Sequence, residues 1–251
     1  MEMIRTKSDG NVALLMLNRG FTNPWNLELV NKLRENIHEL RDDPKVGGII
    51  LTSSNQKFFS IGFDIPELFP LSKEDFKVFY TSYNQLCLDL FTFPKPTIAA
   101  ITGHAVAAGC IITMCCDYRF IAEGRKLMGV NEIKIGVPIP YPASCIMQAL
   151  LGFRTNRDLN DFGEYYPAEE LLKMGLVDRV LPLEQVLPES IALIKKIASY
   201  PFHAFSMIKR NRTETIAKHI REHLTEQDDY FINCWYSEET RPLLEWAMQK
   251  F

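Results

Sequence analysis

The sequence predicts one α/β domain, because short apolar runs alternate with longer segments of helical periodicity. The clearest runs are GGIILTS at 47–53 and TIAAI at 97–101, and DYRFIA at 117–122 is a third strand candidate. Short, nearly continuous apolar runs are typical of parallel strands that are buried on both faces. Parallel strands joined through helices form α/β folds with right-handed crossovers. No linker rich in Ser, Gly or Pro divides the 251 residues into two domains.

The elements before the first buried strand are a hairpin and a helix. Residues 2–7 and 12–18 flank the turn-forming sequence SDGN, so the chain is expected to open as a β-hairpin. Apolar residues then recur at helical spacing from Leu27 to Leu40, and Pro44 follows them. This spacing predicts an amphipathic helix that ends before the proline.

The later elements alternate between helix and strand and then become helical. A helical pattern covers roughly 73–93, and LVDRVL at 176–181 is a fourth strand candidate. From about residue 184 onward the pattern is helical, with Pro201 as a break. We therefore expect an α/β core over residues 1–195 and a C-terminal helical region over residues 196–251.

Charge and composition exclude several classes of protein. The net charge of −3 and the isoelectric point near 6.0 give no reason to expect nucleic acid or an anionic membrane as a partner. No apolar run reaches the ~20 residues of a membrane-spanning helix, and the N-terminus does not have the pattern of a signal peptide. The six cysteines follow no zinc or redox spacing, which favours reduced thiols in a cytoplasmic protein.

Two segments that follow buried strands have the residues of an anion-binding backbone. In the sequence SIGFD at 60–64, the glycine allows close approach and Asp64 can cap a short helix, which leaves the Phe63 N–H free. In GHAVAAGC, small residues precede an apolar helix that begins near Ala108 and Gly109, where free N–H groups favour negative charge. A plain strand–turn–helix junction and tight helix–sheet packing are the structural alternatives for the two segments.

A third segment supplies a carboxylate. Glu132 precedes an apolar stretch from Ile133 to Pro142 in which Lys134 is the only other charged residue. A carboxylate with apolar neighbours is a better base, because desolvation raises its pKa. A surface position in a turn after Asn131 is the alternative.

The order and spacing of these segments resemble the crotonase superfamily of enoyl-CoA hydratases and isomerases. The resemblance covers nearly the whole chain and includes NRGFTNPWN, FFSIGFDI, GHAVAAGC, CDYRFIAE, NEIKIGVP, YYPAEELLKMGLVDRVLP and CWYSEETRP. It implies a crotonase-type right-handed spiral of ββα turns with a C-terminal helical region that trimerises. It also implies an acyl-CoA thioester as substrate, with coenzyme A as part of that substrate and no separate cofactor.

By this resemblance, the N–H groups of Phe63 and Ala108 form an oxyanion hole, and Glu132 is the catalytic acid and base. Two fixed N–H donors stabilise the negative charge of a thioester enolate without reorganising. The residues expected to bind substrate lie around these groups: Pro24, Trp25, Ser60, Ile61, Gly62, Asp64, Ile65 and Gly109. No metal ion is expected, because no cluster of metal ligands is evident among the five histidines.

A departure from the hydratase pattern indicates which reaction is catalysed. Hydratases of the superfamily resemble two-carboxylate catalysts, and this chain has Ile111 where the first glutamate would fall. The segments resemble most those of mitochondrial-type 3,2-enoyl-CoA isomerases, in which one carboxylate moves a proton from the α to the γ carbon. We therefore expect isomerisation of 3-enoyl-CoA to 2-enoyl-CoA. Enoyl-CoA hydration, another crotonase-type acyl-CoA reaction and non-catalytic binding of acyl-CoA are the alternatives.

The C-terminal segment is apolar enough to require a docking surface. A terminal segment of this kind frays unless it packs on something. Packing within the chain is one possibility, and the resemblance favours a homotrimer or a hexamer. The residues concerned are Phe231, Trp235, Tyr236, Leu243, Leu244 and Trp246.

Overall fold

The N-terminal hairpin forms the edge of a six-stranded sheet. In the computed structural model, which describes residues 2–249, β1 (Ile4–Asp9) and β2 (Val12–Leu17) pair antiparallel as predicted. Four parallel strands extend the sheet from β2 in the order β3 (Gly48–Ser53), β5 (Thr97–Ile101), β7 (Tyr118–Ala122) and β10 (Arg179–Leu181). The domain limits predicted from the sequence also include Met1 and residues 250–251, which lie outside the described residues.

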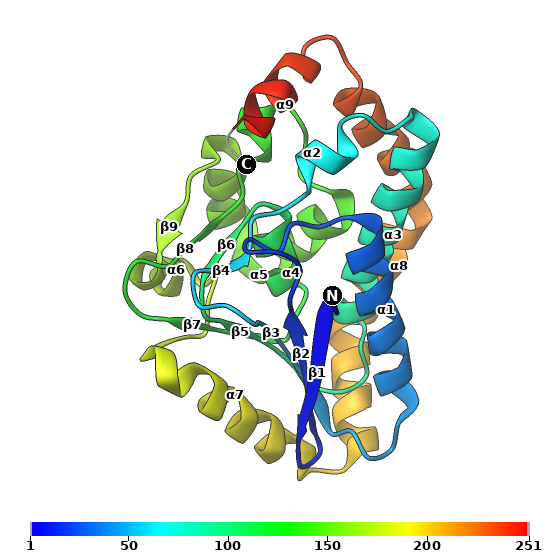
Figure 1. Cartoon of the computed structure of the whole chain (residues 1–251). Coiled ribbons are helices and arrows are strands. Elements are labelled where there is room, and N and C mark those ends of the chain that lie inside the picture. The colour runs from blue at the N-terminus through cyan, green and yellow to red at the C-terminus, as the bar shows by residue number, and fades with distance from the viewer. Residues whose placement is uncertain (1, 250–251) are drawn as a thin grey trace.

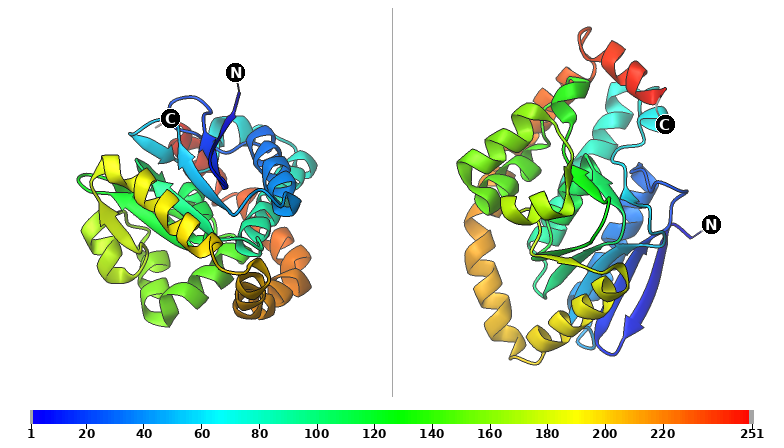
Figure 2. Two further views of the ribbon diagram at one scale, coloured as in Figure 1. Left: turned by 90° about the horizontal axis from the view of Figure 1, so that it is seen from below. Right: turned by 90° about the vertical axis from the view of Figure 1, so that its left-hand side faces the viewer.

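Both faces of this sheet are covered, which explains the continuous apolar runs. Ile50 and Ile98 belong to the core beneath α7 (Leu183–Ala198), whereas their neighbours Leu51 and Ala99 belong to the larger core on the opposite face. Figures 1 and 2 show α7 alone on one side and the other long helices on the other side. The prediction of strands buried on two faces is therefore confirmed.

A second sheet of four short strands was not predicted. Its strands, in order, are β4 (Phe58–Ser60), β6 (His104–Val106), β8 (Leu127–Gly129) and β9 (Tyr166–Pro167). The chain passes from a strand of the first sheet to a strand of the second and then into helical structure. These helices are α2 (Ile65–Leu68) and α3 (Lys73–Phe91) after β4, α4 (Ala108–Met114) after β6, and the 3-10 helix η1 (Glu132–Ile135) and α5 (Tyr141–Phe162) after β8. They complete the β–β–α turns of the expected spiral.

The remaining helices surround this spiral. The predicted N-terminal helix is α1 (Leu27–Asp42), which packs beside α3, and α6 (Ala168–Met174) joins β9 to β10. In the C-terminal region, α8 (Phe202–Trp235) packs on α3 and α5, and α9 (Arg241–Met248) lies against α2 and η1. The predicted boundary at residue 195 falls inside α7, which ends at Ala198, so the core extends to the break at Pro201. Lys209 of α8 forms a buried ion pair with Asp117 beside β7, with 2.6 Å between Nζ and Oδ2, and this pair connects α8 to the edge of the sheet region.

Most of the apolar C-terminal residues pack within the chain. The Trp235 and Phe231 rings stack on Phe76 and Tyr80 of α3 at centroid distances of 4.5 and 4.1 Å. Both side chains and that of Leu244 are buried. The prediction that these three residues cover a subunit interface is therefore wrong, because α3 and the neighbouring core already bury them. Leu243 and Trp246 remain 39% and 52% exposed.

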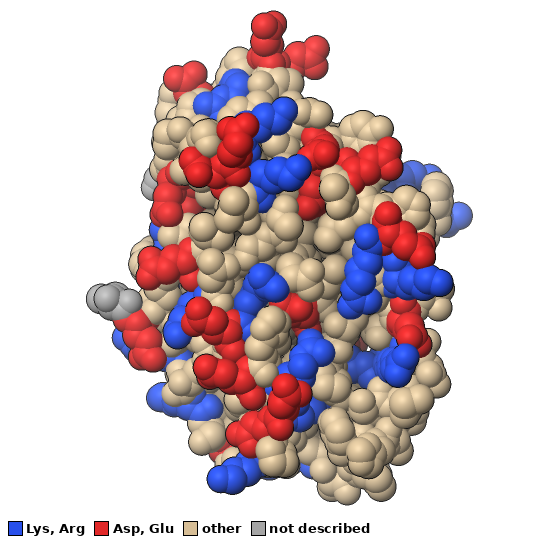
Figure 3. Space-filling model, turned by 90° about the vertical axis from the view of Figure 1, so that its right-hand side faces the viewer, with Lys and Arg blue, Asp and Glu red and all other residues tan. Residues whose placement is uncertain are grey.

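The surface over α1 and α3 carries mixed charge. Figure 3 shows Lys and Arg side chains interspersed with Asp and Glu side chains over this face. Some of them form ion pairs between helices, such as Lys77 of α3 with Asp229 of α8 at 2.7 Å. Among residues 2–249, no helix combines the length and the apolar character that crossing a bilayer requires.

Candidate active site

The ends of β4 and β6 bring the two predicted N–H donors together. These strands pair in parallel, so the segments that follow them leave at the same edge of the sheet. The two segments meet at Gly62, where an added Cβ would lie 2.8 Å from Ala107 Cβ and 3.3 Å from Ala108 N. Gly62 has a φ of +100°, a conformation that glycine adopts readily and other residues do not.

The loop around Phe63 is held by its neighbours and not by its own N–H. The Trp25 N–H donates to the Gly62 carbonyl at 2.8 Å, and the Asp64 N–H donates to the Trp25 carbonyl at 2.9 Å. Asp64 also caps α2, as predicted, by accepting from the Glu67 N–H. In the part of the chain that the structure describes, no protein acceptor takes the Phe63 N–H. This donor is available to a ligand.

The second donor lies at the start of α4. Ala107 precedes the helix with a φ of 49° and a ψ of −129°, and its N–H donates to the Gly129 carbonyl at 2.9 Å. Ala108 is the first helical residue, where N–H groups have no partner inside the helix. Within residues 2–249, no protein acceptor takes the Ala108 N–H either. Gly109 lets α4 approach the end of β4, because an added Cβ would lie only 2.5 Å from the Ser60 carbonyl oxygen.

Glu132 is buried, so the alternative of a surface turn residue is wrong. Its exposed fraction is 6%, and its Oε2 has no hydrogen-bond partner among the described residues. Burial raises the pKa of Glu132 to about 7, although backbone hydrogen bonds at Glu132 and Asn131 lower it in part. A carboxyl group with this pKa exchanges a proton readily near neutral pH.

One cavity of about 480 Å³ joins these groups. Phe63, Ala108 and Glu132 all line it, together with the predicted residues Ile61 and Ile65. Most of the remaining wall is apolar and comes from segments far apart in the sequence. Its members include Val106, Ile135, Val137, Pro140, Tyr165, Phe231, Trp235, Trp246 and Ala247.

The other predicted substrate-binding residues do not line this cavity but support its wall. The Trp25 ring is fully buried and packs on Tyr83. The Asp64 carboxylate forms an ion pair with Arg19, which also donates to the Pro24 carbonyl. The residues whose contact with substrate stays a prediction are Pro24, Trp25, Ser60, Gly62, Asp64 and Gly109.

A second cavity, of about 520 Å³, lacks these features. It lies where the end of α1 meets the segment between α7 and α8, and Arg41, Lys45 and Lys95 contribute to its lining. None of Phe63, Ala108 or Glu132 reaches it. We therefore assign the site by its chemistry and not by cavity size.

Two groups of residues escaped the sequence-based prediction. The pair Phe231 and Trp235 lines the cavity, and its spacing on one helical face was a usable signal that we assigned to subunit contact. The sequence HIREH at 219–223 was also missed. It brings His219 and His223 together with Glu222 on α8, so the expectation that no metal-ligand cluster exists among the histidines is wrong.

The chain is similar over nearly its whole length to proteins of one family. The profile of the enoyl-CoA hydratase/isomerase family matches residues 7–248. The human mitochondrial enoyl-CoA delta isomerase 1 is 28% identical over 208 residues, which are 82% of this chain and 69% of that protein. A probable enoyl-CoA hydratase of Mycobacterium tuberculosis is 31% identical over 239 residues, 95% of this chain and 91% of that protein. The crystal structure of human mitochondrial delta3-delta2-enoyl-CoA isomerase superposes with a TM-score of 0.96 at 25% identity, covering 99% of this chain and 98% of that one.

Proposed function

Because this chain belongs to the enoyl-CoA hydratase/isomerase family, we propose that it converts 3-enoyl-CoA to 2-enoyl-CoA with Glu132 as the single acid and base. The observation that carries the proposal is the composition of the cavity wall. Among the described residues that line it, Glu132 is the only carboxylate. Moving a double bond requires one group that removes a proton and returns it. Ile111, at the position of the first hydratase glutamate, is fully buried and does not line the cavity.

The reaction follows from the placement of three groups. The Glu132 carboxylate removes a proton from the α carbon, and the electron pair moves onto the thioester oxygen to give a dienolate. The N–H groups of Phe63 and Ala108 donate hydrogen bonds to that oxygen. The protonated Glu132 then returns the proton to the γ carbon, and the electrons move back to form the 2,3 double bond. The pKa of about 7 suits Glu132 to both steps near neutral pH.

The apolar wall supports isomerisation over hydration. Val137 and Phe231 offer no polar group that could hold a water molecule beside the double bond, and the indole N–H is the only polar group that Trp235 offers. An acyl chain packed on these side chains also excludes water from the dienolate. Hydration is the second candidate, because a relative that is 31% identical is a probable enoyl-CoA hydratase.

An assay of the purified protein on 3-enoyl-CoA and 2-enoyl-CoA distinguishes the candidates. We expect 3-enoyl-CoA to give an isomer of equal mass, with little hydrated product from either substrate. Glu132→Gln serves as the control, because it removes the base and keeps the shape of the side chain. Faster formation of 3-hydroxyacyl-CoA than of the isomer, measured by liquid chromatography and mass spectrometry, would contradict the proposal.

We also propose that the chain assembles as a homotrimer or as a hexamer, with no cofactor apart from the coenzyme A of the substrate. The exposed side chains of Leu243 and Trp246 on α9 support an apolar contact with another chain. Light scattering at micromolar concentration should give a particle of at least three chains. A stable, active monomer of 28.9 kDa would exclude this assembly.

A further inference from the structure

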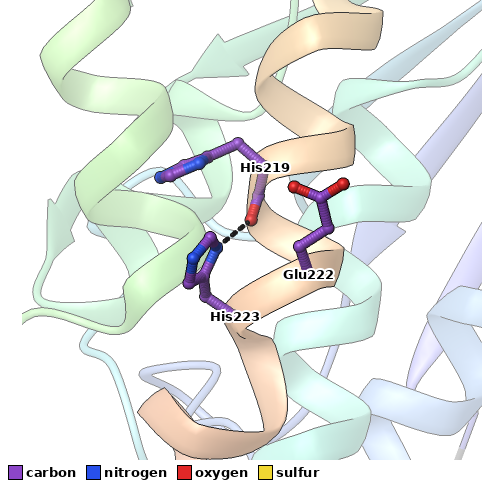
Figure 4. Close-up of side chains that lie close together, drawn as sticks. All are labelled: His219, Glu222 and His223. Carbon is purple, nitrogen blue, oxygen red and sulfur yellow. Dashed lines mark hydrogen bonds between the residues drawn. The ribbon is translucent and has the colours of Figure 1, made fainter.

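A group of potential metal ligands lies on α8, outside the catalytic cavity. His219, Glu222 and His223 each offer one ligand atom, and these atoms lie within 4.8 Å of one another. The helix itself brings them together, because residues three and four positions apart are neighbours on its surface. Figure 4 shows both imidazole rings on one flank of α8 and Glu222 leaving from the other flank. The two ring centroids are 4.6 Å apart.

Each ring is oriented by a hydrogen bond that leaves its other nitrogen available. The His223 Nδ1 lies 2.9 Å from the His219 carbonyl oxygen, which can only accept, so this nitrogen carries the proton and Nε2 keeps its lone pair. The His219 Nε2 lies 2.9 Å from the Tyr141 hydroxyl, and in the tautomer in which Nε2 donates to that oxygen, Nδ1 keeps its lone pair for an ion. Histidines that bind metal ions are held in this way, through a hydrogen bond at the second nitrogen.

We propose that His219 and His223 bind a divalent transition-metal ion, with Glu222 as a third ligand and water in the remaining position. Imidazole is a preferred ligand of zinc, copper and nickel ions. In a tetrahedral zinc site with Zn–N distances near 2 Å, ligand atoms are about 3.3 Å apart. The ligand atoms of the widest pair would therefore move closer by up to about 1.5 Å, which side-chain rotation on the helix surface permits.

The three ligands are not equivalent. The Lys218 ammonium lies 3.9 Å from Glu222 Oε1 and competes with an ion for this carboxylate. The two histidines face no such competition from this lysine, so they supply most of the affinity. The bound ion would connect successive turns of α8 beside Tyr141, the first residue of α5. It therefore stabilises the fold and does not depend on the proposed reaction.

Calorimetric titration of the full chain with zinc chloride tests the site. We expect about one ion per chain, and a loss of affinity of about tenfold or more for His219→Ala and for His223→Ala. Glu222→Gln should lose less. His203→Ala is the matched control, because His203 is exposed on the same helix and lies away from the group. It should keep the affinity of the unmodified chain.

Thermal unfolding provides an independent measurement. Zinc should raise the melting temperature of the unmodified chain and of His203→Ala, because the ion binds the folded state. It should not raise that of the double variant His219→Ala/His223→Ala, whose fold circular dichroism confirms. Magnesium at the same concentration should have no effect, because it prefers oxygen ligands. Zinc binding that survives in the double variant, or an equal response to magnesium, would overturn the proposal.

Discussion

The two walls of the proposed catalytic cavity are constructed in different ways. On one wall, the proposed active groups are the main-chain N–H donors of Phe63 and Ala108, which neighbouring hydrogen bonds and close packing hold in place. On the other wall, the proposed active groups are side chains, namely Glu132 and the aromatic rings of Phe231 and Trp235. The first wall depends on backbone shape, so we expect it to tolerate those changes of side chain that leave the backbone in place. The second wall depends on the identity of each side chain.

The largest expected loss of activity comes from a substitution in the side-chain wall. Glu132→Gln should lower kcat by about a thousandfold, because general acid–base catalysis contributes a factor of this order. Binding of acyl-CoA should change little, since the N–H donors and the apolar wall remain. Steady-state kinetics on 3-enoyl-CoA and binding measurements check the two expectations. A variant that keeps most of the isomerase rate would show that another group is the base.

The same substitution should stabilise the protein at alkaline pH. The folded-state pKa of Glu132 is about 7, above the ordinary value of 4.5, so its contribution to stability is fully present below pH 4.5 and is lost as the pH rises through 7. At pH 8 the buried Glu132 carboxylate is charged, and this charge destabilises the folded state. Glu132→Gln removes the charge and should raise the free energy of unfolding by up to roughly 3 kcal/mol. Denaturant titrations at pH 5 and pH 8 measure the difference. Equal stabilisation at both pH values would contradict the raised pKa.

The next largest effect is on the backbone wall. Gly109→Ala places a Cβ 2.5 Å from the Ser60 carbonyl oxygen, so α4 must move away from β4 and carry the Ala108 N–H with it. Losing one such donor costs roughly 2.7–4 kcal/mol, which is at least a hundredfold in kcat. Phe63→Leu is the control, because it changes the side chain and keeps the N–H. We expect it to lose less than about tenfold in kcat/KM.

Circular dichroism of both variants separates this effect from unfolding. If Phe63→Leu is as inactive as Gly109→Ala while both remain folded, the loss of an N–H donor does not explain why these variants are inactive.

The pH dependence of kcat/KM should depend on the side-chain wall alone. The N–H donors do not titrate in the accessible range, whereas Glu132 must be deprotonated to act as the base. Below its pKa of about 7, kcat/KM should therefore fall about tenfold for each pH unit and should level off above it. Initial rates between pH 5 and pH 9 measure the profile. A flat profile across pH 7 would exclude Glu132 as the titrating base.

The smallest expected effect concerns strain in the backbone wall. Ala107 has a φ of 49° and a ψ of −129°, a region that favours glycine. Ala107→Gly should relieve this strain and raise the free energy of unfolding by about 1 kcal/mol. The isomerase rate should change little, because Ala108 keeps its N–H. Denaturant unfolding measures the gain, and a loss of stability would show that the Ala107 methyl group makes a necessary contact.

The sequence predicts those strands and helices whose hydrophobic pattern lies within one short segment. The strands at 97–101 and 48–53 and the helix from Leu27 were predicted closely, because burial on two faces or on one stripe leaves a readable pattern. The strands of the second sheet have two or three residues, which is too short for any period to appear. The long helix α5 also escaped prediction, because Gly152 interrupts it with a φ of 70°.

The candidate site was predictable in part for the same reason. The residues around Phe63, Ala108 and Glu132 lie in short segments with recognisable order. The wall formed by Phe231, Trp235 and residues of α9 depends on tertiary contacts between segments more than a hundred positions apart, which one sequence does not reveal. The prediction that Asp64 caps a helix was correct. Its ion pair with Arg19 was not predicted, because it depends on packing between segments far apart in the sequence.

The order of the cavity residues along the chain has a consequence for biosynthesis. The two N–H donors and Glu132 lie in the first half or near the middle of the sequence, whereas the apolar wall extends from Phe231 to Ala247. During translation the N-terminal residues of a protein emerge first, whereas a domain generally folds as one unit. The proposed proton-transfer groups are therefore synthesised well before the residues that close the cavity around them. A chain that ended before residue 231 would lack the apolar wall that Phe231, Trp235 and α9 supply to the cavity. The last residues to be synthesised thus supply the part of the wall that would exclude water from the proposed reaction.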